Sequence, residues 1–211
     1  MSDTIRDRVL AEALLKIPEA GISDETLARA AEKTGVAKRE LADAFPQGPV
    51  SLVEAFSHWA DRRMEGTVAA AGPQRMRERI TIAVRARIET MAPHKAAARR
   101  ATAFLAQPQH AALAAKLMMQ SVDAMWRAAG DRSSDFSYYT KRATLAGVYA
   151  STFAYWLSDS SEGNAATWTF LDNRIDNVMQ FEKFKGAAQD ALSKLPDPLK
   201  LFAGLRDRPG K

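Results

Sequence analysis

The chain has 211 residues, of which 30 are Lys or Arg and 25 are Asp or Glu, so its formal net charge is +5. With 46% apolar and 26% charged residues, it has the composition of one or two globular domains and is not a wholly disordered chain. The absence of cysteine excludes disulfides, thiolate metal sites and cysteine nucleophiles, and with three histidines we expect no metal centre. No 18-residue stretch is free of charge, so we expect no membrane-spanning helix.

The pattern of the chain is helical almost throughout. Alanine is abundant, the β-branched residues are scattered, and no alternation of apolar and polar residues persists. Turn-forming clusters, such as residues 18–23, 45–49, 130–134 and 158–164, separate nine or ten helical segments. These features predict an all-α fold. We expect three parts: residues 1–60, residues 61–185 and an amphipathic tail at 186–211.

The first 60 residues have the spacing of a helix-turn-helix. Ser23 and Asp24 are helix-start residues, and Gly35 supplies a left-handed turn before a second short helix. This part resembles the amino-terminal module of TetR-type regulators, in which a glycine-valine turn precedes a short helix ending in Phe-Pro. The matching residues here are Gly35-Val36 and Phe45-Pro46.

The charge of this module argues against DNA binding. Residues 1–60 carry seven basic and ten acidic groups, a net charge of −3, whereas DNA-binding modules place cations on phosphates. Where TetR-type proteins usually have a tyrosine and a lysine that contact phosphates, this chain has Ala42 and Gly48, and Glu40 and Asp43 would face the backbone. We therefore expect a degenerate module and no nucleic-acid partner. A TetR-type transcription regulator with an apolar effector pocket remains the alternative.

A more specific signature lies at residues 129–156 and 167–178. It resembles the ubiquinone (coenzyme Q) biosynthesis lipid-binding accessory family, which has a TetR-like fold. The matching pieces are Ala129-Gly130-Asp131, Ser134-Asp135-Phe136, Tyr139-Thr140-Lys141-Arg142, Val148-Tyr149, and Thr167-Trp168 through Arg174-Ile175.

The resemblance implies a protein that is not an enzyme, and we expect a homodimer without a cofactor. Members bind isoprenoid lipid or phospholipid in the helical core and present the quinone precursor to a di-iron hydroxylase. They dock on a membrane through an amphipathic carboxy-terminal helix. We expect the dimer to form through helices near 140–180 and the protein to be cytoplasmic, peripheral to the inner face of the cytoplasmic membrane.

Two helical faces are candidates for the lipid pocket. By themselves these residues also fit an ordinary core, but the resemblance implies a pocket, and flexible Met side chains adapt to irregular apolar ligands. The predicted lipid-binding residues are Met118, Met119, Val122, Met125, Leu145, Val148, Tyr149, Thr152, Phe153 and Trp156.

Two further surfaces have predicted roles. Trp126, Tyr138 and Tyr139 flank the 130–135 loop, near which the family docks its hydroxylase, and Ser134 or Asp135 is expected to cap the following helix. In the tail, Asp197 and Pro198 start a short amphipathic helix. Its predicted membrane-binding residues are Leu199, Leu201, Phe202 and Leu205.

The positive charge is concentrated outside the first module. Segment 75–100 alone has eight cations against two carboxylates, and residues 61–211 together carry +8. Because anionic headgroups attract nearby cations, we expect this basic segment to face a membrane.

Overall fold

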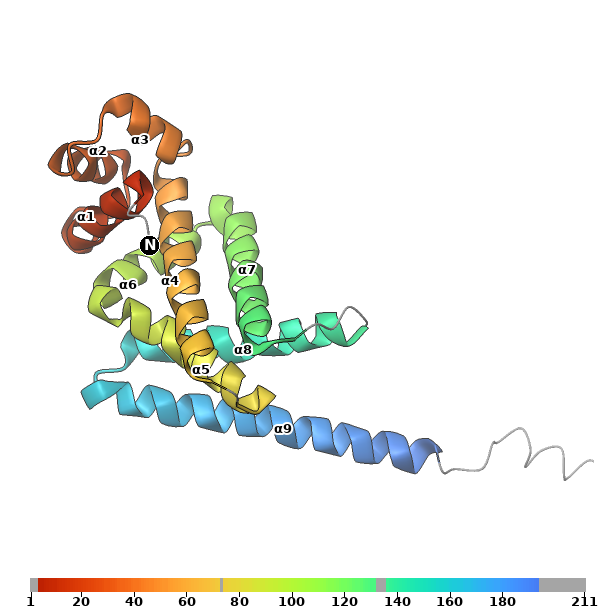
Figure 1. The fold of residues 1–211 in the computed structure, drawn as a ribbon. Helices are drawn as coiled ribbons and strands as arrows, with labels where there is room; N and C mark the ends of the chain where they lie inside the picture. The colour runs from red at the N-terminus through yellow and green to blue at the C-terminus, as the bar shows by residue number, and fades with distance from the viewer. Residues whose placement is uncertain (1–3, 73, 132–135, 194–211) are drawn as a thin grey trace, which may run out of the picture. The chain divides into compact units, whose positions relative to one another are not determined.

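The computed structural model describes residues 4–72, 74–131 and 136–193, and every element within these ranges is helical (Figure 1). The predicted all-α class is confirmed. The helices are α1 (Ile5–Ala20), α2 (Asp24–Lys33), α3 (Lys38–Ala44), α4 (Pro49–Ala70), α5 (Met76–Met91), α6 (Lys95–Leu105), α7 (Ala111–Ala129), α8 (Phe136–Ser158) and α9 (Ala165–Ser193). Single 3-10 turns occur at Ala92–His94, Pro108–His110 and Glu162–Asn164.

Helices α1 to α3 form the small amino-terminal module. The Ser23 side chain accepts a hydrogen bond from the backbone N–H of Thr26 and caps α2, as predicted. Gly35 has a φ of 68°, the left-handed conformation that the turn between α2 and α3 requires. Glu40 accepts a hydrogen bond from the Ala37 backbone N–H at 3.0 Å, so its carboxylate completes the start of α3.

Gly48 stands at the junction of this module with the long helix α4. Its backbone has a φ of 53° and a ψ of −121°, and a Cβ built there would lie 2.4 Å from Oδ1 of Asp24. A side chain at this position would have a strained backbone and would require the Asp24 carboxylate to move. The backbone conformation of this junction therefore favours glycine where TetR-type proteins usually have a phosphate-contacting lysine.

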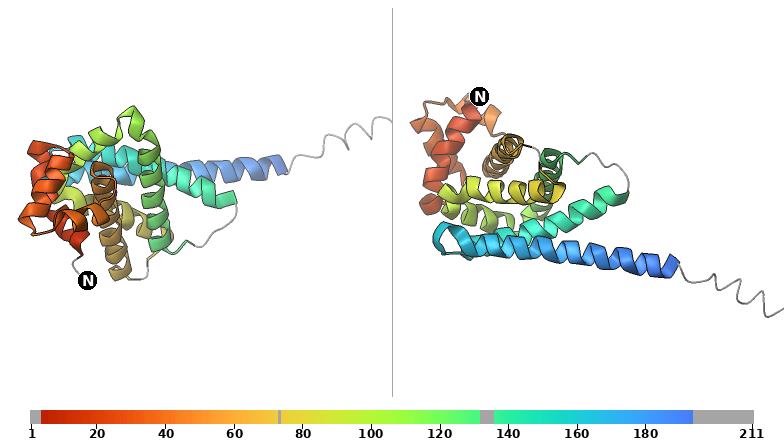
Figure 2. Two further views of the ribbon diagram at one scale, coloured as in Figure 1. Left: turned by 90° about the horizontal axis from the view of Figure 1, so that it is seen from above. Right: turned by 60° about the horizontal axis from the view of Figure 1, so that its bottom comes forward.

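Helix α4 connects the module to a helical bundle. It packs against α5 and α7, and α7 in turn packs against α5 and α8 (Figure 2). Fully buried apolar side chains fill the bundle core, among them Leu52, Met64, Val84, Ile88, Met125 and Trp156. The inward-facing positions recur every three or four residues, as amphipathic helices require.

The chain divides into two compact units, residues 1–171 and 172–211, so the boundary falls within α9. The three-part division expected from the sequence stays a prediction. The expected caps Ser134 and Asp135 and the four tail residues Leu199, Leu201, Phe202 and Leu205 lie outside the described residues. Among the helices of the described part, none is long and apolar enough to cross a membrane.

The basic segment 75–100 is used largely within the fold. Backbone carbonyls at or beside the carboxy-terminal ends of α1, α7 and α8 accept hydrogen bonds from four of its cations, an arrangement that also suits the negative end of the helix dipole. Arg79 donates to Ala128, Lys95 to Asp159, Arg99 to Leu157 and Arg100 to Pro18. A fifth cation, Arg87, is buried in the bundle. The expectation that the whole segment faces a membrane is therefore too broad.

Candidate functional site

A cavity of about 310 Å³ lies within the bundle. Its size is at the lower end of the range of small-molecule sites, about 300–1,000 Å³. Thr102 and Ala106 at the end of α6 are exposed, which places the opening there. The lining comes from α4 to α8: Val53, Phe56, Ser57, Arg87, Met91, Ala98, Ala101, Thr102, Leu105, Ala106, Ala114, Leu117, Met118, Ser121, Tyr149 and Phe153.

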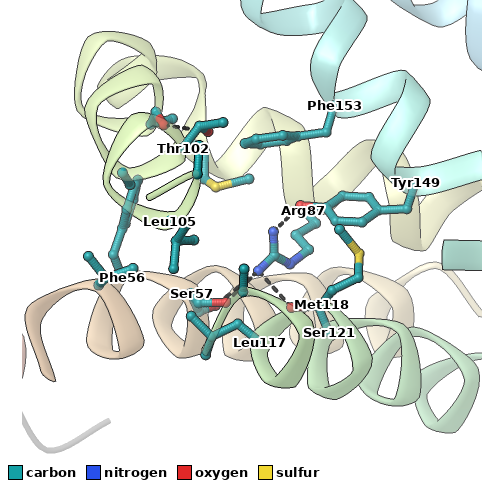
Figure 3. A pocket seen from close by; sticks show the side chains of 16 residues that line it. Phe56, Ser57, Arg87, Thr102, Leu105, Leu117, Met118, Ser121, Tyr149 and Phe153 are labelled. Carbon is teal, nitrogen blue, oxygen red and sulfur yellow. Dashed lines mark hydrogen bonds between the residues drawn. The ribbon is translucent and has the colours of Figure 1, made fainter. Parts of the chain in front are cut away.

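The wall of the cavity is apolar except at one end, where the guanidinium of Arg87 lies between three helices (Figure 3). Its Nε donates to Oδ1 of Asp61 at 2.7 Å, and its Nη2 donates to the hydroxyls of Ser57 at 2.9 Å and Ser121 at 2.8 Å. Its Nη1 donates to the hydroxyl of Tyr149. We call Arg87, Asp61, Ser57, Ser121 and Tyr149 the polar floor.

The polar floor is buried, and its charges are compensated. Arg87 is 4% exposed and Asp61 is 7% exposed, and together they carry no net charge. Burial alone lowers the pKa of Arg87, but the charges of Tyr149 and Asp61 and the hydrogen bonds to them raise it above its ordinary value. Burial raises the pKa of the Tyr149 hydroxyl, although Arg87 opposes this shift. Arg87 is thus charged and Tyr149 is neutral at physiological pH.

The structure brings only part of the predicted lipid-binding set to the cavity. Met118, Tyr149 and Phe153 line it. Met119 points away, with 45% of its surface exposed. The remaining six are buried in the bundle without lining the cavity: Val122, Met125, Leu145, Val148, Thr152 and Trp156.

Apart from Tyr149, the residues of the polar floor were not predicted from the sequence, and neither was the wall supplied by α4 and α6. The floor could have been recognised from two charged residues that occupy inward-facing positions of otherwise apolar helix faces. Arg87 falls on the same face of α5 as the buried Val84 and Ile88, and Asp61 falls on the buried face of α4 beside Ala60 and Met64. A cation and an anion that both interrupt inward-facing stripes are expected to pair.

The corner formed by α7 and α8 contains the three predicted partner-binding residues. Tyr139 is 72% exposed and packs edge-on against Tyr138, with ring centroids 5.2 Å apart. The Arg142 guanidinium lies over the ring of Tyr138. Trp126 is half-buried, and its indole N–H donates to the carbonyl of Lys141 at 3.3 Å. Tyr139 is therefore the most accessible of the three rings.

The cavity combines features from which small-molecule pockets are commonly built. In the residues that the structure describes, no group of three or more His, Asp or Glu could hold a metal ion. The cavity wall offers apolar contact, and its floor offers oriented hydrogen-bond donors, which is the usual construction of a small-molecule pocket.

Comparisons with known proteins agree with the sequence signature. Residues 111–182 match the COQ9 family model. The chain is similar to proteins named "Ubiquinone biosynthesis protein COQ9, mitochondrial". The identity is 34% for that of Drosophila melanogaster (85% of this chain, 57% of the relative), 32% for that of Rattus norvegicus (84% and 59%) and 30% for that of Homo sapiens (84% and 58%). The chain thus spans somewhat more than half the length of these curated relatives.

Among solved structures, the fold resembles that of a TetR transcriptional regulator from Nitrosomonas europaea. The TM-score is 0.67 at 22% sequence identity, over 82% of this chain and 96% of the other. At this identity the likeness concerns the fold alone, and it confirms the predicted TetR-like fold.

One expectation is wrong. The protein was expected to be cytoplasmic and peripheral to the inner face of the cytoplasmic membrane, but the relatives are named mitochondrial. Charge and hydropathy describe how a chain folds and what it contacts; they do not identify its compartment. The predicted family resemblance, in contrast, is confirmed: the chain has a TetR-like fold and is similar to the COQ9 proteins of ubiquinone biosynthesis.

Proposed function

We propose that this protein is a non-enzymatic accessory factor of ubiquinone biosynthesis. It binds isoprenoid quinone precursors in the bundle cavity and presents them to a membrane-associated hydroxylase. The observation that carries the proposal is the largely apolar cavity of about 310 Å³, lined in part by residues 111–182, the stretch that matches the COQ9 family. An isoprenoid tail gains favourable burial in such a wall.

The accessory role also needs docking surfaces. The exposed ring of Tyr139, beside Tyr138 and Trp126, is the proposed contact for the hydroxylase, because aromatic side chains are frequent anchors of protein interfaces. The tail residues Leu199 to Leu205 are proposed to bind the membrane, and helices near 140–180 are proposed to form a homodimer. Tyr139→Ala should weaken capture of the hydroxylase, whereas Tyr155→Ala, which removes another exposed tyrosine of α8, should not.

Lipid binding in the cavity can be tested with a substitution whose larger side chain fills the cavity. Ala114 lines the cavity from α7, and its neighbour Ala115 is exposed on the same helix. In Ala114→Phe the new ring occupies the cavity, while Ala115→Phe adds the same ring to the surface. Mass spectrometry of copurifying lipids should therefore find isoprenoid quinone precursors or phospholipid with wild type and Ala115→Phe, but not with Ala114→Phe.

Ubiquinone content measured in cells tests the pathway itself. A deletion strain should lose ubiquinone, and the gene for Ala115→Phe should restore it while that for Ala114→Phe does not. Normal ubiquinone in the deletion strain would refute the proposed function. Equal lipid in all three proteins would refute the assignment to this cavity.

A TetR-type regulator shares the fold, but the amino-terminal module disfavours that function. The carboxylate of Glu40 caps α3, and the positive φ of Gly48 disfavours a lysine at the position where TetR-type proteins usually have a phosphate-contacting one. With a net charge of −3 on residues 1–60, the module lacks the cations from which DNA binding gains most of its affinity.

A further inference from the structure

The polar floor holds more hydrogen-bond donors than acceptors. A guanidinium has five N–H groups, two of them on Nη1. Within the described part of the chain, the bonds of Arg87 use its Nε–H, one N–H of Nη1 and both N–H groups of Nη2. One N–H on Nη1 therefore remains for a ligand.

The hydroxyls of the floor add to this surplus. Tyr149 accepts from Arg87, so its own proton is available to donate, and no acceptor for it occurs among the described residues. The Ser57 hydroxyl also accepts from Arg87 and keeps its proton. Ser121, in contrast, donates to Oδ2 of Asp61 at 3.3 Å. Tyr149 and Arg87 thus present adjacent donors at the end of an apolar wall.

The charge of the floor restricts what those donors can hold. Arg87 is the only charged residue in the described cavity lining, and Asp61 directly behind it neutralises it. An anion would bring a net negative charge into an apolar enclosure and would compete with Asp61 for the same guanidinium. A neutral oxygen accepts the free N–H and O–H groups without that penalty.

We infer that the polar floor selects the head of the ligand: it binds a neutral molecule whose oxygen acceptor, a carbonyl or ether oxygen, is held by Tyr149 and Arg87. The apolar body of the ligand lies against Phe153, Met118 and Leu105 towards the opening. This inference rests on the proposed function, since it concerns the same cavity, and it assigns Tyr149 and Arg87 as specificity residues.

Three probes with the same geranyl chain test this inference by titration calorimetry. Geranylbenzene has no oxygen, geranyl-1,4-benzoquinone has neutral acceptors, and 4-geranylbenzoate carries a negative charge. The quinone should bind roughly thirtyfold more tightly than geranylbenzene, which is about what two added hydrogen bonds contribute. The benzoate should bind most weakly of the three.

Three variants test which side chain causes the difference in affinity. Tyr149→Phe removes one of the two donors and keeps the ring, and it should reduce the affinity for the quinone roughly fivefold without changing the affinity for geranylbenzene. Tyr155→Phe, an exposed position on the same helix, is the matched control and should change neither. If Tyr149→Phe does not fold, Ser57→Ala can be used instead, because it removes another hydroxyl of the polar floor with a smaller change in the side chain.

The outcomes distinguish the recognition of the ligand head by the polar floor from the proposed use of the cavity as a lipid pocket. Equal binding of geranylbenzene and the quinone, or tightest binding of the benzoate, overturns the inference while leaving an apolar pocket and the proposed function in place. An equal loss of affinity for all probes in Tyr149→Phe also overturns it, because the hydroxyl would then act only on the fold. If none of the probes binds, both the inference and the proposed use of the cavity fail.

Discussion

Replacing Arg87 by methionine should be among the most damaging single changes in the bundle. The side chain of Arg87 is 4% exposed and donates to Asp61, Ser57, Ser121 and Tyr149. Its loss leaves the Asp61 carboxylate buried, and among the described residues only the Ser121 hydroxyl still donates to it. Breaking a buried ion pair by removing one partner costs about 3–5 kcal/mol. That is a large part of the roughly 5–15 kcal/mol by which domains are stable.

Urea unfolding followed by circular dichroism measures this loss. The control is Arg85→Met on the same helix, whose exposed side chain pairs with Glu89 and lies over the ring of Trp168, and which should cost no more than about 1.5 kcal/mol. Adding Asp61→Asn to Arg87→Met removes the uncompensated charge and should recover at least about 1 kcal/mol. A single variant within about 1 kcal/mol of wild type, or a double variant less stable than the single one, would refute the role of this ion pair.

Three further changes test other parts of the fold. Gly48→Ala places a Cβ 2.4 Å from Asp24 at a φ of 53°, and it should lower the unfolding free energy by about 1–3 kcal/mol in urea titrations. Burial raises the pKa of Tyr149, so its contribution to stability is complete below pH 10.0, the ordinary value, and is lost as the pH rises further. In thermal unfolding experiments above that pH, the Tyr149→Phe protein should therefore lose less stability with rising pH than the wild type does. Hydrogen bonds at the start of α9, first that from the Thr167 hydroxyl, lower the pKa of Asp159 below its ordinary value of 3.8. The stabilisation is thus present above that pH and lost below it, so Asp159→Asn should destabilise the protein at neutral pH and flatten the acid limb of its stability curve.

The fold was largely predictable because its determinants are local. Helix-start residues such as Ser23 and left-handed glycines such as Gly35 act within a few residues of where they stand, and both were identified correctly. The end of α7 before Gly130 was also predicted, and this glycine has a φ of 89°. Such features depend on backbone geometry that each residue type adopts almost independently of the rest of the chain.

The cavity was less predictable because it depends on contacts between distant segments. Periodicity identifies which face of α7 and α8 is buried, but a buried face packs against neighbours as readily as it lines a cavity. Val122 and Met125 took the first role and Met118 the second. The pairing of Arg87 with Asp61 spans 26 residues and two helices, and it needed the packing of α4 on α5 to become visible.

The net charge of +5 is weaker evidence for an anionic partner once the positions of the cations are known. A basic chain first suggests an anionic partner, yet the cations of segment 75–100 act largely on the protein itself. Arg87 compensates a buried carboxylate, and Arg79, Arg99 and Arg100 donate to carbonyls at helix ends. Hydrogen bonds to neutral carbonyls fix these side chains in place but do not cancel their charges, whereas Asp61 does compensate the charge of Arg87. The membrane binding that we propose for the tail should therefore still weaken with rising salt concentration, because exposed cations such as Arg99 and Arg100 keep their charge.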